Sequence, residues 1–364
     1  MTTTASTIDL AVDGDLQDLM DDLVAGHSGP DIEPDPAAVW ATLGAVGLAR
    51  LTAPEETGGS GAGWVEAAAL LRTTAAGGVA VPFAETDLLA GPLRRAAGLD
   101  DSSSDTATVA VLRADGLAQR VPWAGATGSV VCVRRVDAGY EIADVPTDRL
   151  TVEAVEGISE VPLGSVRVDG DVTWTPVDTR AVEDYVLRGA LIRAIQCVGA
   201  MEGMLASAVA HTTDRAQFGR PLARFQSVQN LVVDTAAESV LARAAVDTAL
   251  ADAVTDDLAG DFSAFRVAVA RSVVSPALAV AVRNTHQVHG AIGTTHEHTL
   301  HRLTLPALQW RSEFGSAAFW ERQLSRAAVD AGMDGTWPMI VEGTRITGTA
   351  SAYLDAVSGR SRPD

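Results

Sequence analysis

The fold of this chain is decided by two stretches of sequence, Arg215-Ala-Gln-Phe-Gly-Arg-Pro-Leu-Ala-Arg-Phe-Gln226 and Gln287-Val-His-Gly-Ala-Ile-Gly293. The first supplies a permanent cation, a planar aromatic ring and two amide side chains beside a Gly-Arg-Pro helix break. Because a guanidinium matches the geometry of phosphate oxygens and keeps its charge, Arg215 suits a pyrophosphate. The second stretch places Gln287 before a Gly-Ala pair, where the backbone can lie close against a ligand.

At this separation the two stretches resemble the dinucleotide-binding signature of the acyl-CoA dehydrogenase family of flavoenzymes. The resemblance covers roughly residues 30–328 and implies roles at the ADP end of an FAD cofactor. Arg215 would neutralise the pyrophosphate, Phe218 would pack on the cofactor, and Gln226 would hydrogen-bond toward its ADP portion. The residues that would shape the adenine-side pocket are Gln287, His289, Gly290 and Ala291, the last standing where the family prefers glycine.

Hydrophobic periodicity divides the chain into four parts. Residues 1–105 are predicted to be an N-terminal helical domain, in which a glycine-rich turn at Pro54–Gly61 joins two helices and resembles a turn of the same family. Residues 106–180 change to short β-prone runs between Gly, Asp and Pro breaks and are predicted to be a small β domain. These runs are Thr108–Leu112, Ser129–Val133, Gly139–Ile142, Leu150–Ala154 and Val166–Val168.

Residues 181–330 return to long Ala- and Val-rich helical stretches, Ala181–Thr213, Gln226–Asp252 and Phe262–Thr285. The order helix, β, helix with a C-terminal four-helix bundle is the acyl-CoA dehydrogenase architecture. The predicted fold class is therefore α+β, mainly α. Residues 331–364 are a C-terminal extension that the resemblance does not cover.

Composition excludes several kinds of partner. The formal charge is −20, and every one of the 27 basic side chains is arginine. Nucleic acid and anionic membrane surfaces attract basic faces, so neither is expected as a partner. Cys132 and Cys197 stand among apolar neighbours and read as reduced core thiols of a cytosolic protein. The first residues lack the blocks of a signal peptide, and no run of eighteen apolar residues predicts a membrane span. A cytoplasmic location is expected.

The resemblance also sets a test of catalysis. An acyl-CoA dehydrogenase removes the α-proton of its substrate with a carboxylate whose pKa lies near the operating pH, while the β-hydride passes to FAD. The family places that carboxylate either twenty-seven residues after the motif glutamine or twenty-nine before the motif phenylalanine. Counting from Gln287 gives Phe314, and counting back from Phe218 gives Gly189. Neither residue can accept a proton.

Other carboxylates lie near these positions. Glu313 is one residue from the first, but one helical step turns a side chain by about 100°, so it is expected to miss the substrate. It remains the candidate catalytic base of this chain. Glu183 and Asp184 lie more than one turn before the second position and read as helix N-terminal charges. Glu342 belongs to a Glu-Gly-Thr string like that of the family, but at twice the required distance.

The flavin-ring element of the family is missing as well. The family uses a Thr-Glu-Pro-x-x-Gly-Ser-Asp-like segment and a Trp-x-Thr segment of the β domain, whereas the matching region here reads Val121-Pro-Trp-Ala-Gly-Ala-Thr-Gly-Ser-Val130. Thr127–Ser129 is either a remnant of the first segment or, as we favour, a turn between strands. The sequence thus resembles the family at the ADP end and departs from it at the ring and the base.

This combination implies a shared cofactor, because family tetramers place FAD at a dimer interface with its ADP end against the partner. The chain resembles the degenerate subunit of actinobacterial α2β2 enzymes, some of which act on steroid-derived CoA thioesters. The resemblance implies a catalytic acyl-CoA dehydrogenase subunit, an acyl-CoA substrate and an electron-transfer flavoprotein as partners. Two alternatives stay open: a self-sufficient homomeric dehydrogenase that uses Glu313, and a flavin-free scaffold.

A histidine-rich segment offers a competing metal site. It contains His286, His289, His296, His298 and His301, together with Glu297. Clustered histidines and a carboxylate can bind zinc, but neighbours two residues apart diverge on a helix and no cysteine joins them. No metal is expected.

Overall fold

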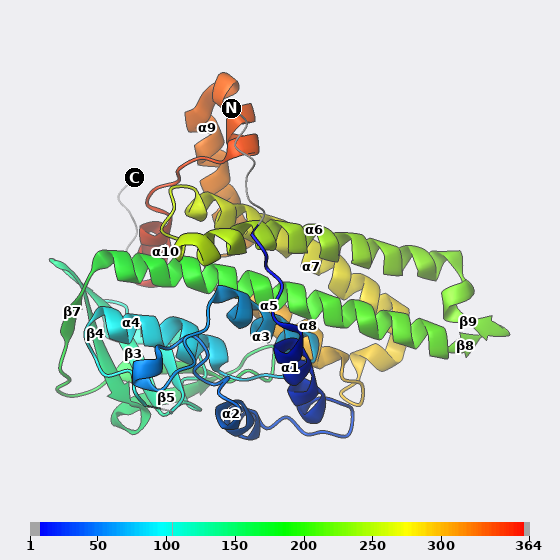
Figure 1. Cartoon of the computed structure of the whole chain (residues 1–364), viewed down its shortest axis with the longest axis horizontal. Helices are drawn as coiled ribbons and strands as arrows, with labels where there is room; N and C mark the ends of the chain where they lie inside the picture. The colour runs from blue at the N-terminus through cyan, green and yellow to red at the C-terminus, as the bar shows by residue number, and fades with distance from the viewer. Residues whose placement is uncertain (1–7, 104, 360–364) are drawn as a thin grey trace.

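Helices occupy both ends of the chain and strands its middle (Figure 1). The computed structural model describes residues 8–103 and 105–359. The predicted fold class, α+β and mainly α with a small β part between helical parts, is confirmed. The predicted thiols are free and buried, and burial raises the pKa of Cys132 to about 12 and that of Cys197 to about 11.

The N-terminal part is helical and contains a buried π-helical turn. Its helices are α1 (Gly14–His27), α2 (Pro36–Ala45), α3 (Trp64–Ala76), the π-turn η2 (Ala84–Ala90) and α4 (Gly91–Ala96). Asp13 and Asp35 cap α1 and α2, since their carboxylates accept hydrogen bonds from backbone N–H groups of the first turn. All residues of η2 are buried, including the carboxylates Glu85 and Asp87. π-Turns are rare and often mark functional positions.

The β part is a two-layer sandwich with a core of its own. Its strands are β1 (Ala107–Val111), β2 (Leu117–Pro122), β3 (Ser129–Val136), β4 (Gly139–Pro146), β5 (Leu150–Val155), β6 (Leu163–Val168) and β7 (Thr175–Val177). One sheet has the order β1-β3-β4-β7 and the other β2-β6-β5. Alternate residues of both sheets, such as Cys132 and Val166, fill the space between the layers.

The C-terminal part is a bundle of long helices. They are α5 (Thr179–Asp214), α6 (Gln226–Asp256), α7 (Ser263–His289), the shorter α8 (Leu300–Trp310) and α9 (Ala317–Glu342). A two-stranded hairpin, β8 (Ala216–Gln217) and β9 (Arg220–Pro221), joins α5 to α6 and projects from one end of the bundle (Figure 1). Gly219 has φ +78 at its turn, a left-handed backbone that glycine adopts without strain.

Two helical segments, Thr179–Asp214 and Ser263–Thr294, are long and apolar enough to cross a membrane by length and composition alone. In the fold they lie in the bundle, with 78% and 56% of their most apolar windows buried. Core helices of a bundle pass the same test, so the finding is weak support for a membrane span.

The C-terminal extension is part of the fold. Helix α9 crosses the predicted boundary at residue 331 and is broken at Gly332, whose φ of 67 and ψ of −175 are not helical. After α9 the chain turns back and forms α10 (Thr349–Val357), whose Ala350 and Leu354 enter the main hydrophobic core. The extension therefore leaves the body and returns to it (Figure 1).

Candidate functional site

A groove of about 650 Å³ lies where the two sequence stretches meet, at the hairpin end of α5 and the end of α7. It is lined by five of the seven residues predicted to bind the cofactor, namely Arg215, Gln287, His289, Gly290 and Ala291. Its volume lies within the range of 300–1,000 Å³ that is usual for small-molecule sites. The two stretches thus form one surface, as the pattern predicted.

Arg215 is the permanent cation of this groove. Its backbone carbonyl accepts a hydrogen bond from the N–H of Leu222, 2.8 Å away, which fixes the start of the hairpin. Within residues 8–103 and 105–359, no carboxylate lies within ion-pairing distance of its guanidinium. On the other side of the groove, Gly290 ends α7 with φ 64, a left-handed conformation that lets the backbone turn sharply there. An exposed, unpaired guanidinium beside an open backbone fits a pyrophosphate.

Two predicted residues lie outside this groove. Phe218 stands at the hairpin tip, 90% exposed, with its ring 6.2 Å from that of Phe225. Gln226 is the exposed first residue of α6. Neither residue lines the groove of its own chain, so their roles toward a cofactor remain predictions.

The groove also holds residues that the sequence motifs did not single out. His211, one helical turn before Arg215, stacks on His289 with ring centroids 4.5 Å apart. His298 packs edge-on against the other side of His289, at 4.8 Å. The turn spacing of His211 could have revealed it, but the approach of His298 depends on how the loop after α7 folds.

These three histidines form a cluster of packed imidazole rings. Their ring nitrogens lie within 4.8 Å of one another, as ligands of a metal could. Nδ1 of His298 accepts a hydrogen bond from the N–H of Leu300, 3.1 Å away. His289 donates from Nδ1 to the Thr285 carbonyl, 2.8 Å away. One ring nitrogen of each is therefore used within the fold, and the absence of a metal stays a prediction.

Burial lowers the pKa of His289 to about 4 and also lowers the pKa values of His211 and His298. Because the unfolded chain binds a proton on this imidazole at higher pH than the folded chain, stability falls as pH drops from about 6.5 to 4. We expect the free energy of unfolding to lose about 2 kcal/mol through His289 between pH 7.5 and pH 5. Urea unfolding of wild type and His289→Gln at both pH values measures this. An equal loss in both proteins would contradict the assignment.

The two positions that the family uses for its catalytic carboxylate meet in space, and both are closed. A Cβ on Gly189 of α5 would lie 2.2 Å from the Phe314 ring, so the ring fills the place of any side chain there. Phe314 itself is buried and packs edge-on against Tyr185, 5.3 Å away. The ring of Tyr353, from α10 in the extension, stacks on Phe314 at 6.0 Å. An aromatic cluster therefore occupies the space at both positions.

The loop that carries Phe314 is held rigidly. Arg271 of α7 is buried and donates to the carbonyls of Arg311, Glu313 and Gly315 at 2.8–2.9 Å. Trp320 donates from its indole N–H to the Phe314 carbonyl, 3.1 Å away. Burial lowers the pKa of Arg271, whose charge is met by the carbonyl dipoles at the end of α8.

Glu313, the candidate base, belongs to a buried ion-pair triad. One of its carboxylate oxygens lies 2.7 Å from Nε of Arg193, and the other accepts from Gln309 at 3.0 Å. The second partner of Arg193 is Glu85 of η2, 2.5 Å away. Burial acts to lower the pKa of Arg193, but Glu313 and Glu85 raise it overall. Both oxygens of Glu313 are engaged, which supports a structural role for this carboxylate.

The cavity beside this triad, between the β part and the bundle, is closed as well. It measures about 10 Å³, enough for one water at most. Trp123 and Val161 bound it on the β side, and Glu85, Arg193 and Trp310 on the helical side. A flavin ring and an acyl chain do not fit there. The groove lined by Arg215, in contrast, is open, with a volume of about 650 Å³.

The predicted remnant Thr127–Ser129 is a turn between β2 and β3. The Thr127 hydroxyl lies 3.2 Å from the carbonyl of Trp123 and the same distance from that of Ser129. The Ser129 hydroxyl accepts from Arg94 at 2.7 Å. These polar groups are used within the fold, as expected for a turn.

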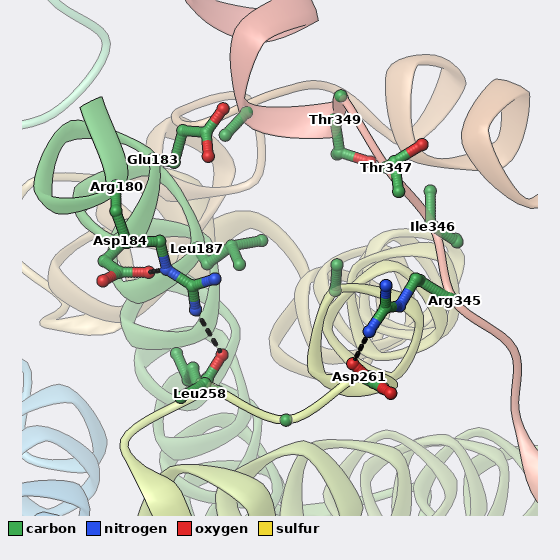
Figure 2. A pocket seen from close by; sticks show the side chains of 15 residues that line it. Arg180, Glu183, Asp184, Leu187, Leu258, Asp261, Arg345, Ile346, Thr347 and Thr349 are labelled. Atoms are coloured by element: carbon green, nitrogen blue, oxygen red, sulfur yellow. Dashed lines mark hydrogen bonds and ion pairs between the residues drawn. The ribbon is translucent and has the colours of Figure 1, made fainter.

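A separate pocket of about 280 Å³ lies where the extension returns to the body (Figure 2). It contains Asp184, paired with Arg180 at 2.7 Å, and Asp261, paired with Arg345. Glu183, on the same wall, accepts from Ser351 of α10 at 2.9 Å. The carboxylates expected to be helix N-terminal charges are thus engaged in pairs and hydrogen bonds.

Comparisons with known proteins agree with this geometry. Residues 18–98 match the acyl-CoA dehydrogenase N-terminal domain, and residues 181–328 match the acyl-CoA dehydrogenase C-terminal domain. The chain belongs to the acyl-CoA dehydrogenase family. Family membership supports an oxidoreductase role and FAD as the cofactor.

Similar proteins include the acyl-CoA dehydrogenase FadE34 of Mycobacterium tuberculosis, 29% identical over 317 residues. The match covers 81% of this chain but only 42% of FadE34, so the chain spans less than half of that relative. Among solved structures, the ChsE4-ChsE5 complex of Mycobacterium tuberculosis matches with a TM-score of 0.79 at 22% identity, over 89% of this chain and 99% of that chain. The structure of the Tcur3481-Tcur3483 steroid ACAD matches with a TM-score of 0.73 at 23% sequence identity. This match covers 87% of the present chain and 97% of that chain. Both structures show the likeness of fold.

Proposed function

We propose that this chain is the cofactor-completing subunit of a hetero-oligomeric, FAD-dependent acyl-CoA dehydrogenase. It supplies the ADP-end half of the FAD site, while a partner subunit supplies the catalytic carboxylate and the flavin-ring site. One observation carries the proposal: the Phe314 ring fills the place of a side chain at Gly189, while the ADP-end groove of the same chain is open. A carboxylate able to take a proton from substrate must then come from elsewhere.

The reaction of the complex is the α,β-desaturation of an acyl-CoA thioester. FAD, when bound, accepts the hydride. Arg215 holds and neutralises the pyrophosphate, and the backbone at Gly290 and Ala291 shapes the wall beside it. Phe218 and Gln226 are exposed outside this groove and are assigned contacts with the cofactor where it extends toward the partner subunit. No proton transfer is assigned to this chain.

Partners and substrate class follow from the same proposal. The assembly is an α2β2 heterotetramer in the cytoplasm, with an electron-transfer flavoprotein as electron acceptor. The match to a complex of two named chains and to a steroid dehydrogenase supports a heteromer that acts on a steroid-derived acyl-CoA.

Co-expression tests this proposal. The chain expressed alone is expected to be colourless and inactive, whereas co-expression with a full-motif acyl-CoA dehydrogenase subunit should yield a yellow, active complex. Flavin absorbance and acyl-CoA oxidation with an artificial electron acceptor measure the two properties. Stoichiometric flavin and turnover in the lone chain would instead establish the self-sufficient enzyme, and an active complex whose flavin is independent of this chain would establish the scaffold.

Glu313→Gln in the complex decides which subunit holds the base. We expect turnover to change by no more than about twofold, because Glu313 pairs with Arg193 and does not face a substrate cavity. A base removed from the reaction lowers the rate by about 10²–10⁴. A loss of that size, with normal flavin content and an unchanged melting temperature, would place the base in this chain.

A further inference from the structure

The outer part of α9 exposes large apolar side chains that the rest of the fold leaves uncovered. Met333 is 96% exposed and Trp337 72%, and Val329, Ile340 and Val341 are exposed as well. Residues 329–342, here called the arm, stand clear of the bundle on its α6 side (Figure 1). The arm lies beyond residue 328, where the match to the family's C-terminal domain ends.

The exposed side chains share one face of the helix that follows the break at Gly332. Met333, Trp337 and Val341 are spaced four residues apart, and Ile340 lies beside them, which places all four on one side. Met339, on the opposite side, is buried. The arm therefore has an inner face against its own chain and an outer face that is apolar.

The size of this outer face is that of a protein interface. These four side chains, together with Val329 before the break, offer on the order of 600 Å² of surface, as large as the biggest apolar patch on a typical monomer and most of the roughly 800 Å² that one partner buries in a stable complex. Tryptophan and methionine are also enriched at interface centres.

Both ends of the arm are fixed to the body. At the start of α9, Trp320 is fully buried. After the arm, Gly343 passes against the Phe262 ring, and Arg345 pairs with Asp261 (Figure 2). In α10, Asp355 pairs with Arg135 of β3, and Leu354 is in the core. A segment held at both ends presents its surface with little ordering cost on binding.

Charge favours a partner of different composition. The ionisable side chains of the arm are the acids Asp330, Asp334 and Glu342, and the whole chain carries −20. Two copies would bring like charges together around an apolar contact, whereas a subunit with a basic rim would be attracted.

We infer that the arm docks into an apolar groove with a basic rim on the catalytic dehydrogenase subunit of the oligomer. This inference rests on the proposed function and adds to it the surface through which the two subunits recognise one another. The test compares the double variant Met333→Asp/Trp337→Asp with the control Ile158→Asp, which changes an exposed apolar side chain of the β part, 53% accessible, away from the arm. Each is co-expressed with the catalytic subunit, and the complex is diluted and followed by mass photometry.

The arm variant is expected to weaken the complex about thirtyfold or more, as loss of an interface centre does, and the control to change it less than about twofold. Circular dichroism melting should be alike for all three chains, because the substituted side chains are exposed. Equal dissociation constants for wild type and arm variant would overturn the docking surface and leave the proposed function standing. Absence of any complex with wild type would overturn both. Self-association of the isolated chain that the arm variant abolishes would make a second copy the occupant and overturn this assignment.

Discussion

Arg193→Met is expected to lower the free energy of unfolding by about 3–5 kcal/mol, because it leaves the carboxylates of Glu85 and Glu313 in the core without their cation. Arg193 is 2% exposed and Glu85 3%, so water screens little of this cost. Urea unfolding at neutral pH, followed by circular dichroism, gives the difference directly.

Arg243→Met is the matched control. Arg243 also contacts two carboxylates, Glu202 at 2.8 Å and Asp247 at 3.1 Å, but all three side chains are about one-third exposed. Its loss should cost no more than about 1 kcal/mol, as is usual for surface pairs. Similar losses for the two variants would mean that the Arg193 triad is hydrated and that the cavity beside it is wider than described.

Arg215→Ala is expected to weaken FAD binding by the complex about tenfold to a hundredfold, since a hydrogen bond to a charged group contributes about 1.5–3 kcal/mol. The guanidinium is the permanent charge of the groove, and no neighbouring carboxylate competes for it among the described residues. Titration of the flavin-depleted complex with FAD, followed by fluorescence quenching, measures the dissociation constant.

Arg180→Ala serves as its control, because Arg180 is an exposed arginine at the other end of the same helix. We expect its effect on FAD affinity to stay within about twofold. If Arg215→Ala also left the affinity unchanged, the ADP end of the cofactor would lie outside this groove, although the subunit pairing could persist.

Much of the fold could be predicted because its signals are local. Each of the five β-prone runs falls on a strand and each of the three long Ala-rich stretches on α5, α6 or α7, to within one residue at the ends. Strands β2 and β7 were missed: β2 has two adjacent polar residues, Gln119 and Arg120, that break its alternation, and β7 has only three residues. The π-turn η2 could not be foreseen either, since its buried Glu85 is stabilised by an arginine 108 residues further along the chain.

The site shows the same division. Spacing alone identified Gly189 and Phe314 as the positions to examine, and five residues of the ADP-end motifs do line one groove. Spacing could not reveal that the Phe314 ring fills the space beside Gly189. It also could not reveal that Tyr353 of α10 stacks on the Phe314 ring. Both facts depend on how helices distant in sequence pack, and the second on a segment outside the family resemblance.

The contact between Gly189 and the Phe314 ring also fixes the stoichiometry of the proposed assembly. In each pair of unlike subunits, the Phe314 ring closes the position of the catalytic carboxylate in this chain. An α2β2 tetramer of that kind would therefore bind two acyl groups and not four. Saturating titration of such a complex with an acyl-CoA would end at one equivalent per pair of chains. Half of the protein mass would then serve to complete and hold a cofactor at which the other half does the chemistry.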